Sequence, residues 1–225
     1  NKGIEQAPII VQKCYESVCK HSNQKIILLN DQNLADYIRL PDYIEKKKDA
    51  GQIPMAGYAD LMRFALLEHY GGTWIDSTVY LTDSIPDMIL NSDFFAVRNS
   101  LLLIDNPVLY PAWFLHAKKG NKTIREIRNV AFAYWLKNEH VIEYLLPNLI
   151  ITLVVKSNSE VEKAIPYMNS DYSEYLVKVL ADDYSEEKWN WIKKLTGIHK
   201  LTYKLSPSIE AEGTFYKALI ENRIE

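Results

Sequence analysis

An apolar helical segment carries two opposite charges, and these are the first residues whose types and spacing could do chemistry. Asp60 and Arg63 lie three residues apart within the apolar stretch 58–67. Residues at this spacing share one face of a helix, so the two side chains point the same way. A helix that is apolar nearly all round is buried, and buried charges are costly unless they are paired or used. The pair therefore predicts either a helix salt bridge or a ligand site.

A third charge follows directly after this helix. Gly71 and Gly72 are expected to end the helix, and alternation over Thr73–Leu81 predicts one continuous strand. One face of this strand would carry two aromatic rings, a carboxylate and a hydroxyl: Trp74, Asp76, Thr78 and Tyr80. Aspartate is depleted in strands and is seldom buried without a partner. The combination favours a ligand site over the simpler reading of a salt bridge followed by a helix cap.

Within residues 53–82, the chain has A-D-x-x-R and then L-L-x-x-Y-G-G-x-W-x-D-x-T. This pattern resembles the sugar-nucleotide-binding region of family 32 glycosyltransferases and their capsular polysaccharide synthesis relatives, which carry S-D-x-x-R and then G-G-x-Y-x-D-x-D, the DXD motif. Weaker similarity extends to residues 3–8, 26–30, 113–121 and 200–204. The resemblance implies an α/β fold with a GT-A-like, Rossmann-type sheet that binds a nucleotide sugar.

The resemblance also implies roles for individual residues. Asp60 and Arg63 would grip the donor sugar, and Asp76 would meet the ribose and the metal, so these three are the candidate catalytic residues. Further donor contacts are expected from Gly71, Gly72, Trp74, Thr78, Lys200 and Lys204. The expected donor is a nucleotide-diphosphate sugar, in the first place a UDP-sugar. The acceptor would be a saccharide or a lipid-linked saccharide, glycosylated with retention of anomeric configuration.

The expected metal depends on Thr78, which stands where a DXD motif has its second aspartate, although capsular relatives often carry D-A-T here. Hard cations such as Mn²⁺ or Mg²⁺ prefer several oxygen ligands, so Asp76 and a hydroxyl form a poor cage without the diphosphate. We therefore expect a divalent metal that binds together with the donor. Lys200 and Lys204 share a face of a predicted strand, His199–Leu205, and would help to neutralise the diphosphate; the alternative is an exposed polar face.

Composition narrows the classes of partner. The 225 residues are 48% hydrophobic and 24% charged, which is ordinary for a globular chain, and the formal net charge of −3 gives no support to a nucleic-acid partner. Cys14 and Cys19 lie five residues apart on a predicted helix and point apart, so we expect no disulfide and a cytoplasmic location. The apolar stretch 141–155 is too short to span a bilayer and predicts a core segment, with peripheral contact at the inner membrane face left open.

The order of the predicted elements indicates an α/β sheet with parallel strand pairs, because strands alternate with helices. Helices are expected to begin at Pro8 and Pro41, and strands over Lys25–Asn30, Phe94–Val97 and Leu101–Ile104. The second half reads as helical over 122–138, 141–155, 173–181 and 185–196. We expect a single domain over 1–225, with a donor-binding half (1–118), a helical half (119–225) that closes the site, and the family's first strand missing.

Two other classes of function stay open. A glycoside hydrolase needs two carboxylates across the scissile bond, and Asp60 and Asp76 offer such a pair, but Arg63 would lower the pKa of the acid where the chemistry needs it raised. A non-catalytic saccharide-binding module or a decayed transferase would explain Thr78. His199 is a weaker candidate metal ligand, and Trp113 a candidate for the acceptor side.

Overall fold

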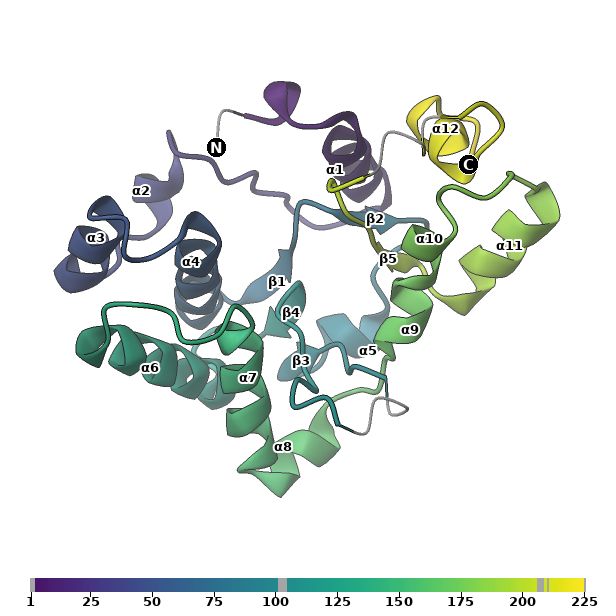
Figure 1. Ribbon diagram of the computed structural model, residues 1–225. Helices are drawn as coiled ribbons and strands as arrows, with labels where there is room; N and C mark the ends of the chain where they lie inside the picture. Colours follow the sequence, from purple (N-terminus) through teal and green to yellow (C-terminus); the bar gives the residue numbers. More distant parts are fainter. Residues whose placement is uncertain (1–2, 101–104, 206–208, 210, 225) are drawn as a thin grey trace. The chain divides into compact units, whose positions relative to one another are not determined.

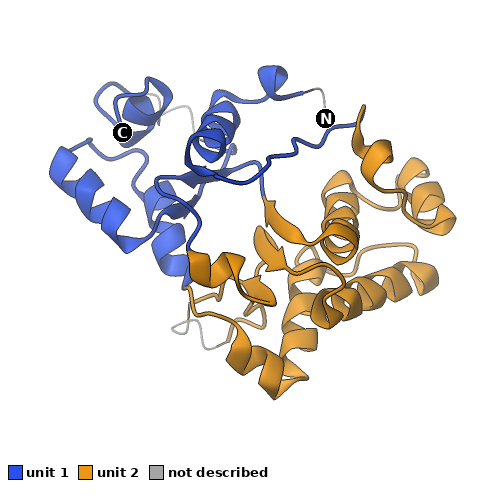
Figure 2. Cartoon of the chain, turned by 180° about the vertical axis from the view of Figure 1, so that it is seen from behind, with its two compact units in different colours: residues 1–31, 76–86, 169–225 blue, residues 32–75, 87–168 orange. Residues whose placement is uncertain are grey.

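The computed structural model describes residues 3–100, 105–205, 209 and 211–224, and its chain divides into two compact units. Unit 1 comprises residues 1–31, 76–86 and 169–225, and unit 2 comprises residues 32–75 and 87–168 (Figure 2). Neither unit follows the predicted boundary between residues 118 and 119, because each contains segments from both predicted halves. The single-domain organisation stays a prediction.

Unit 2 contains a three-stranded antiparallel sheet accompanied by helices (Figure 1). The central strand β4 (Phe114–Ala117) pairs with β1 (Gly72–Ile75) on one side and with β3 (Phe94–Ala96) on the other. The helices of this unit are α2 (Leu34–Tyr37), α3 (Asp42–Asp49), α4 (Met55–Tyr70), α5 (Asp87–Leu90), α6 (Lys122–Lys137), α7 (Leu146–Lys156) and α8 (Ser159–Ala164).

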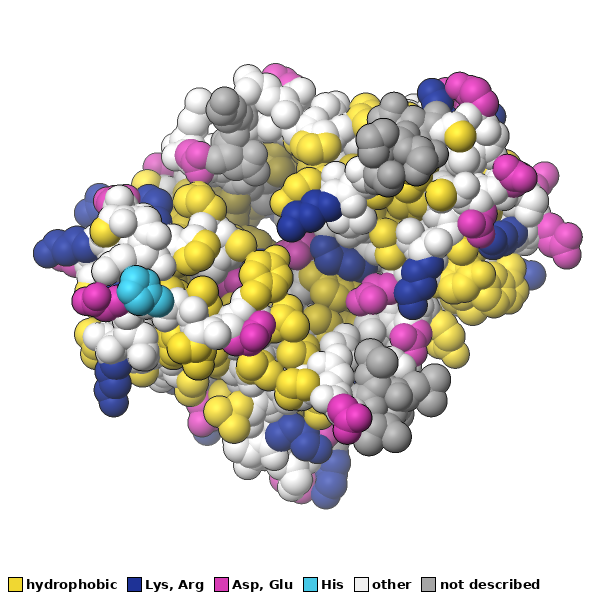
Figure 3. Space-filling view, in the orientation of Figure 1, with side chains coloured by type: hydrophobic (Ala, Val, Ile, Leu, Met, Phe, Trp, Pro, Cys, Tyr) yellow, Lys and Arg dark blue, Asp and Glu magenta, His cyan; other side chains and the backbone are white. Residues whose placement is uncertain are grey.

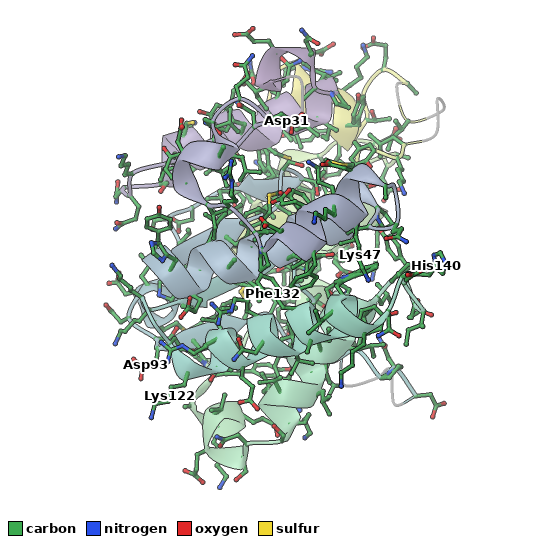
Figure 4. All side chains as sticks on the ribbon, turned by 90° about the vertical axis from the view of Figure 1, so that its left-hand side faces the viewer. Asp31, Lys47, Asp93, Lys122, Phe132 and His140 are labelled. Carbon is green, nitrogen blue, oxygen red and sulfur yellow. The ribbon has the colours of Figure 1, made fainter. Side chains whose placement is uncertain are left out.

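The core of unit 2 forms where α4 packs along α6 and against the sheet, as Figure 4 shows with Lys122 and Phe132 marking α6. The Tyr43 hydroxyl of α3 donates a hydrogen bond to the Phe132 carbonyl at 3.0 Å, which joins α3 to α6. The residues that make up this core are almost fully buried and include Leu61, Phe64, Leu67, Leu115, Ala117, Ile124 and Ile127. Each buried Leu, Ile or Phe side chain stabilises the fold by about 1.5–3 kcal/mol.

Unit 1 combines a two-stranded antiparallel sheet, β2 (Val79–Leu81) with β5 (Ile198–Lys200), and helices. Its other elements are the 3₁₀ turn η1 (Ile4–Gln6), α1 (Ile9–His21), α9 (Ser170–Ser173), α10 (Tyr175–Lys178), α11 (Glu186–Leu195) and α12 (Phe215–Ile220). The amide of Leu81 donates to the Ser17 hydroxyl at 2.9 Å, which ties β2 to α1. Hydrophobic side chains gather over α11 in Figure 3, where Trp191 stays 47% exposed.

The predicted α/β class and the largely helical second half are confirmed. Pro8 and Pro41 directly precede α1 and α3, consistent with the tolerance of a helix N-terminus for proline. Ser185 caps α11 as expected, since its side chain accepts a hydrogen bond from the Lys188 amide. Helix α6 begins at the first residue predicted and ends within one residue of the predicted end.

The predicted parallel pairing is wrong for the described residues, in which every strand pair is antiparallel. The segment 25–30 forms no strand, and none of its side chains is buried. A short apolar run does not become a strand without a partner to pair with, and periodicity alone does not reveal the partner. The predicted strand 101–104 lies outside the described residues.

Two of the predicted helices differ from those observed. The apolar stretch 141–155 becomes helical only from Leu146, because Pro147 suits the first turn of a helix and not its interior. The segment 173–181 holds the end of α9 and the short α10 in place of one helix. In the part of the chain that the structure describes, no helix has the length and apolar character needed to cross a membrane.

Candidate functional site

The charged pair of α4 forms a partly buried salt bridge within unit 2. The Arg63 Nη2 atom lies 3.1 Å from the Asp60 Oδ1 atom, and the two side chains are 9% and 17% exposed. Arg63 also donates a hydrogen bond from Nη1 to the carbonyl of Ala112 at 2.5 Å. The expectation that this part of α4 is buried is therefore confirmed, and the two charges meet as their spacing predicted.

Trp74 of β1 completes the surroundings of Arg63. The guanidinium carbon of Arg63 lies 5.0 Å from the centroid of the Trp74 ring, within the range of a cation–π interaction. A salt bridge, a hydrogen bond and an aromatic ring thus orient one guanidinium group. This arrangement holds the Asp60 carboxylate in one place, which a residue that grips a sugar hydroxyl requires.

The glycines between α4 and β1 have an immediate structural reason. Gly71 has φ 73° and Gly72 has φ 99°, values that strain any residue with a side chain. A Cβ atom on Gly71 would also lie 2.5 Å from the backbone nitrogen of Lys119, so there is no room for one. The turn that leads from α4 into the sheet therefore needs glycine at 71 for conformation and for space, whatever else these two residues do.

The strand predicted over residues 73–81 is interrupted. The prediction that Trp74, Asp76, Thr78 and Tyr80 share one face of one strand is therefore wrong. β1 ends at Ile75, and a turn follows in which the Val79 amide donates to the Asp76 carbonyl at 2.9 Å. Alternation does not continue through a turn, so Trp74 belongs to the sheet of unit 2, whereas Asp76 and Thr78 belong to unit 1. Asp76 is half-buried, Ser77 is exposed and Thr78 is buried.

Lys200 meets both candidate metal ligands of this turn. Its Nζ atom lies 3.7 Å from the Asp76 Oδ2 atom and donates a hydrogen bond to the Thr78 hydroxyl. The Lys200 and Asp76 side chains are 23% and 25% exposed, so the ion pair is only partly screened by water. Unit 1 therefore brings together three of the residues predicted from the sequence: Asp76, Thr78 and Lys200.

The pairing of β2 with β5 places Lys200 beside the turn. Lys200 is the register partner of Val79, the residue directly after the turn. The Leu201 amide donates to the Thr78 carbonyl at 2.8 Å, so the ladder continues one residue beyond each strand. Backbone hydrogen bonds on both sides of the pair thus hold the lysine against the turn.

The other two candidates near β5, His199 and Lys204, have different surroundings from Lys200. Lys204 is exposed and lies beyond β5, because this strand ends at Lys200 and the predicted strand to Leu205 does not form. His199 is fully buried, and its Nε2 atom lies 3.0 Å from the Thr82 hydroxyl. Burial lowers the pKa of His199 to about 4, so the ring is neutral at neutral pH. Its surroundings are those of a core residue.

Sequence reasoning missed Glu174, the carboxylate between α9 and α10. Burial raises the pKa of Glu174, and the nearby positive charges of Lys178 and Lys200 partly offset that rise. Glu174 therefore lies within electrostatic range of Lys200. No local pattern identifies it, because Glu174 comes within electrostatic range of Lys200 only when the neighbouring helices α9 and α10 pack on β5.

The described residues do not fit a divalent metal at the Asp76 turn. Hard cations prefer several oxygen ligands, and here the one carboxylate and the one hydroxyl both face an ammonium group. Among the described residues there is also no cluster of three or more His, Cys, Asp or Glu side chains that could hold a metal ion. The expectation, however, is of a metal that binds together with the donor diphosphate, and that expectation stays a prediction.

Comparison with known protein families decides the family. The sequence model described as "Capsular polysaccharide synthesis protein" matches residues 1–219. The chain belongs to this family. All candidate site residues of the chain, from Asp60 to Lys204, lie within the matched range.

More distant comparisons add little to the family match. A solved structure titled "PaToxG Glycosyltransferase" aligns over 97% of this chain and 82% of its own chain, at 10% sequence identity and a TM-score of 0.46. At this TM-score the likeness does not establish a shared fold. A search of curated proteins found no match.

Proposed function

We propose that this capsular polysaccharide synthesis protein is a glycosyltransferase that moves a sugar from a nucleotide-diphosphate sugar, in the first place a UDP-sugar, to a saccharide acceptor. The observation that carries the proposal is the family match over residues 1–219. The bond from the anomeric carbon to the diphosphate oxygen breaks, and a bond from that carbon to an acceptor oxygen forms. The nucleoside diphosphate leaves with the bonding electrons, and the acceptor hydroxyl loses its proton.

The reaction makes two physical demands. Negative charge that builds on the departing diphosphate must be stabilised, and the anomeric carbon must be held against the acceptor oxygen. Lys200 supports the first demand, because it is a partly exposed cation next to the Asp76 turn. Asp60, oriented by Arg63, suits the second demand, because a fixed carboxylate accepts hydrogen bonds from sugar hydroxyls.

The remaining assignments follow the family resemblance and are part of the proposal. Asp76 would contact the ribose, Trp74 and Gly72 the donor, and Lys204 the diphosphate. Transfer would proceed with retention of configuration, with the acceptor in a capsular polysaccharide. The resemblance also implies a divalent metal with Asp76 as one of its ligands, but the contacts of Lys200 with Asp76 and Thr78 would compete with that metal.

One specific observation argues against the alternative of a glycoside hydrolase. Such an enzyme needs a protonated carboxyl as its acid, yet Asp60 lies 3.1 Å from the Arg63 guanidinium, which favours the charged carboxylate. A non-catalytic saccharide-binding module would bind sugars without turning over any donor.

Calorimetry with a panel of nucleotide sugars, followed by turnover assays on those that bind, tests the proposal and separates the three classes. A transferase binds one donor tightly and releases nucleoside diphosphate when an acceptor is added. A hydrolase cleaves saccharides without binding a nucleotide sugar, and a binding module shows no turnover. Either of these last two results would contradict the proposed activity.

A further inference from the structure

The turn at residues 76–78 already faces a cation that belongs to the chain itself. We propose that Lys200 takes the place of a divalent metal in this site, so that the donor diphosphate binds to its ammonium group and transfer proceeds without a metal ion. The proposal rests on the nucleotide-sugar transferase activity proposed above. It also departs from the metal that the family resemblance predicts for Asp76 and Thr78.

Charge balance supports the exchange of metal for lysine. Two carboxylates and a divalent ion have no net charge, and neither do one carboxylate, one hydroxyl and one ammonium group. The described turn has the second composition, with Asp76 and Lys200 3.7 Å apart and Thr78 as the neutral acceptor. A divalent ion added here would bring the positive charge at the turn to three, one from Lys200 and two from the ion itself, against the single negative charge of Asp76.

The contacts of the ammonium group leave it able to bind phosphate. A lysine ammonium has three N–H donors, and among the described residues Lys200 gives one of them, to Thr78. The separation of 3.7 Å from Asp76 is an ion pair but is too long for a hydrogen bond. Two donors therefore remain for phosphate oxygens, and the side chain is 23% exposed, which leaves a path to a ligand.

The backbone keeps this charge in place before any donor arrives. The β2–β5 register and the hydrogen bond from Leu201 to Thr78 hold the lysine backbone beside the turn. A cation that is already positioned needs little rearrangement when charge develops on the leaving group. Glu174 lies within electrostatic range of Lys200, but it does not join Asp76 in any metal-binding cluster of the described residues.

The test measures nucleoside diphosphate binding with and without a metal. Calorimetry with UDP, GDP, ADP, CDP and dTDP, each in EDTA and in Mn²⁺, gives the affinity, and electron paramagnetic resonance of free Mn²⁺ reports metal binding. We expect the wild-type protein to bind one diphosphate with a Kd that differs by less than twofold between the two buffers, and to take up no Mn²⁺ of its own. A Kd at least tenfold lower in Mn²⁺ would overturn the proposal.

Variants show whether Lys200 is the cation concerned. Lys200→Met should weaken binding of that diphosphate at least tenfold in EDTA, whereas Lys200→Arg, which keeps the charge, should retain most of it. Lys188→Met is the matched control, because Lys188 is another half-buried lysine of unit 1 that forms an ion pair, at 2.7 Å from Asp182. Unchanged binding by Lys200→Met would overturn the assignment and leave Lys200 as a structural partner of Asp76.

A double variant tests the reverse exchange, in which a divalent metal replaces the Lys200 ammonium group. Thr78→Asp combined with Lys200→Ala gives the turn the two carboxylates of a DXD motif and removes the ammonium group. This variant should therefore bind Mn²⁺ and need it for diphosphate binding. Wild-type protein that binds no diphosphate in either buffer would contradict the proposed function and this inference with it. Wild-type protein that binds diphosphate only with Mn²⁺ would contradict the inference alone.

Discussion

Replacing Arg63 with methionine should destabilise the protein much more than its spacing from Asp60 suggests. An exposed helix pair three residues apart contributes about 0.2–0.5 kcal/mol. The Arg63 side chain, however, is only 9% exposed and contacts Asp60, the Ala112 carbonyl and the Trp74 ring at once. Methionine preserves most of the apolar volume of the arginine side chain. The loss in the free energy of unfolding therefore comes mainly from the contacts of the guanidinium group.

The magnitude follows from these contacts. A hydrogen bond to a charged group contributes about 1.5–3 kcal/mol, and a partly exposed cation–π contact about 0.5–1 kcal/mol. Removing the partner of a fully buried charge costs about 3–5 kcal/mol, but Asp60 is 17% exposed and has further contacts, so its share is smaller. We expect Arg63→Met to lower the free energy of unfolding by about 3 kcal/mol, which for a chain of this length lowers Tm by about 6–12 °C.

Urea unfolding followed by tryptophan fluorescence and by circular dichroism measures this loss. The two signals must coincide for a single free energy to apply. Lys163→Met is the matched control, because Lys163 and Glu160 have the same spacing at 3.4 Å but are 74% and 83% exposed. If Arg63→Met lowers the free energy of unfolding by as little as the control does, the reasoning is refuted, because Arg63 and Asp60 would then contribute no more than an exposed ion pair.

The other predictions concern the turn, the glycine and the buried histidine. Asp76→Asn should leave folding intact but abolish transfer and donor hydrolysis; more than half of wild-type turnover would make Asp76 structural. Gly71→Ala should destabilise by about 1–3 kcal/mol more than Gly51→Ala in thermal unfolding, because both glycines have φ 73° but only Gly71 lacks room for a Cβ atom; equal losses would contradict this. The pKa of His199 falls from 6.5 in the unfolded chain to about 4 in the folded chain. Its full contribution to the free energy of unfolding is therefore present above pH 6.5, and about 3 kcal/mol of that contribution is lost as the pH falls to 4. His199→Gln should flatten that slope in urea titrations, and an unchanged slope would show that other groups cause it.

Local features of the site could be predicted from the sequence. The burial of the helix around Asp60 and Arg63 follows from the nearly uninterrupted apolar stretch 58–67, and the salt bridge follows from the three-residue separation. Glycine at 71 was expected to end α4, and it does so with φ 73°. These features depend on residues close together in the chain, where periodicity and backbone preference decide the outcome.

Features that depend on distant pairing could not be predicted. Alternation predicts one strand through Asp76, but the chain turns at Asp76 and then pairs Val79 with Lys200. Thr78 and Lys200 are 122 residues apart, and no local pattern reveals which strand pairs with which. The same lack of a local signal for distant pairing explains the wrong expectation of parallel strand pairs and the unexpected position of Glu174 near Lys200.

The central claim is that this protein transfers a sugar from a nucleotide-diphosphate sugar. Phosphorus-31 NMR of the protein mixed with a panel of nucleotide sugars and capsular oligosaccharides tests it most directly. We predict that one donor is converted to its nucleoside diphosphate, and that Asp76→Asn produces none. Formation of a nucleoside monophosphate would show transfer of a sugar phosphate, and no conversion of any donor would leave a binding module. Either result would contradict the account.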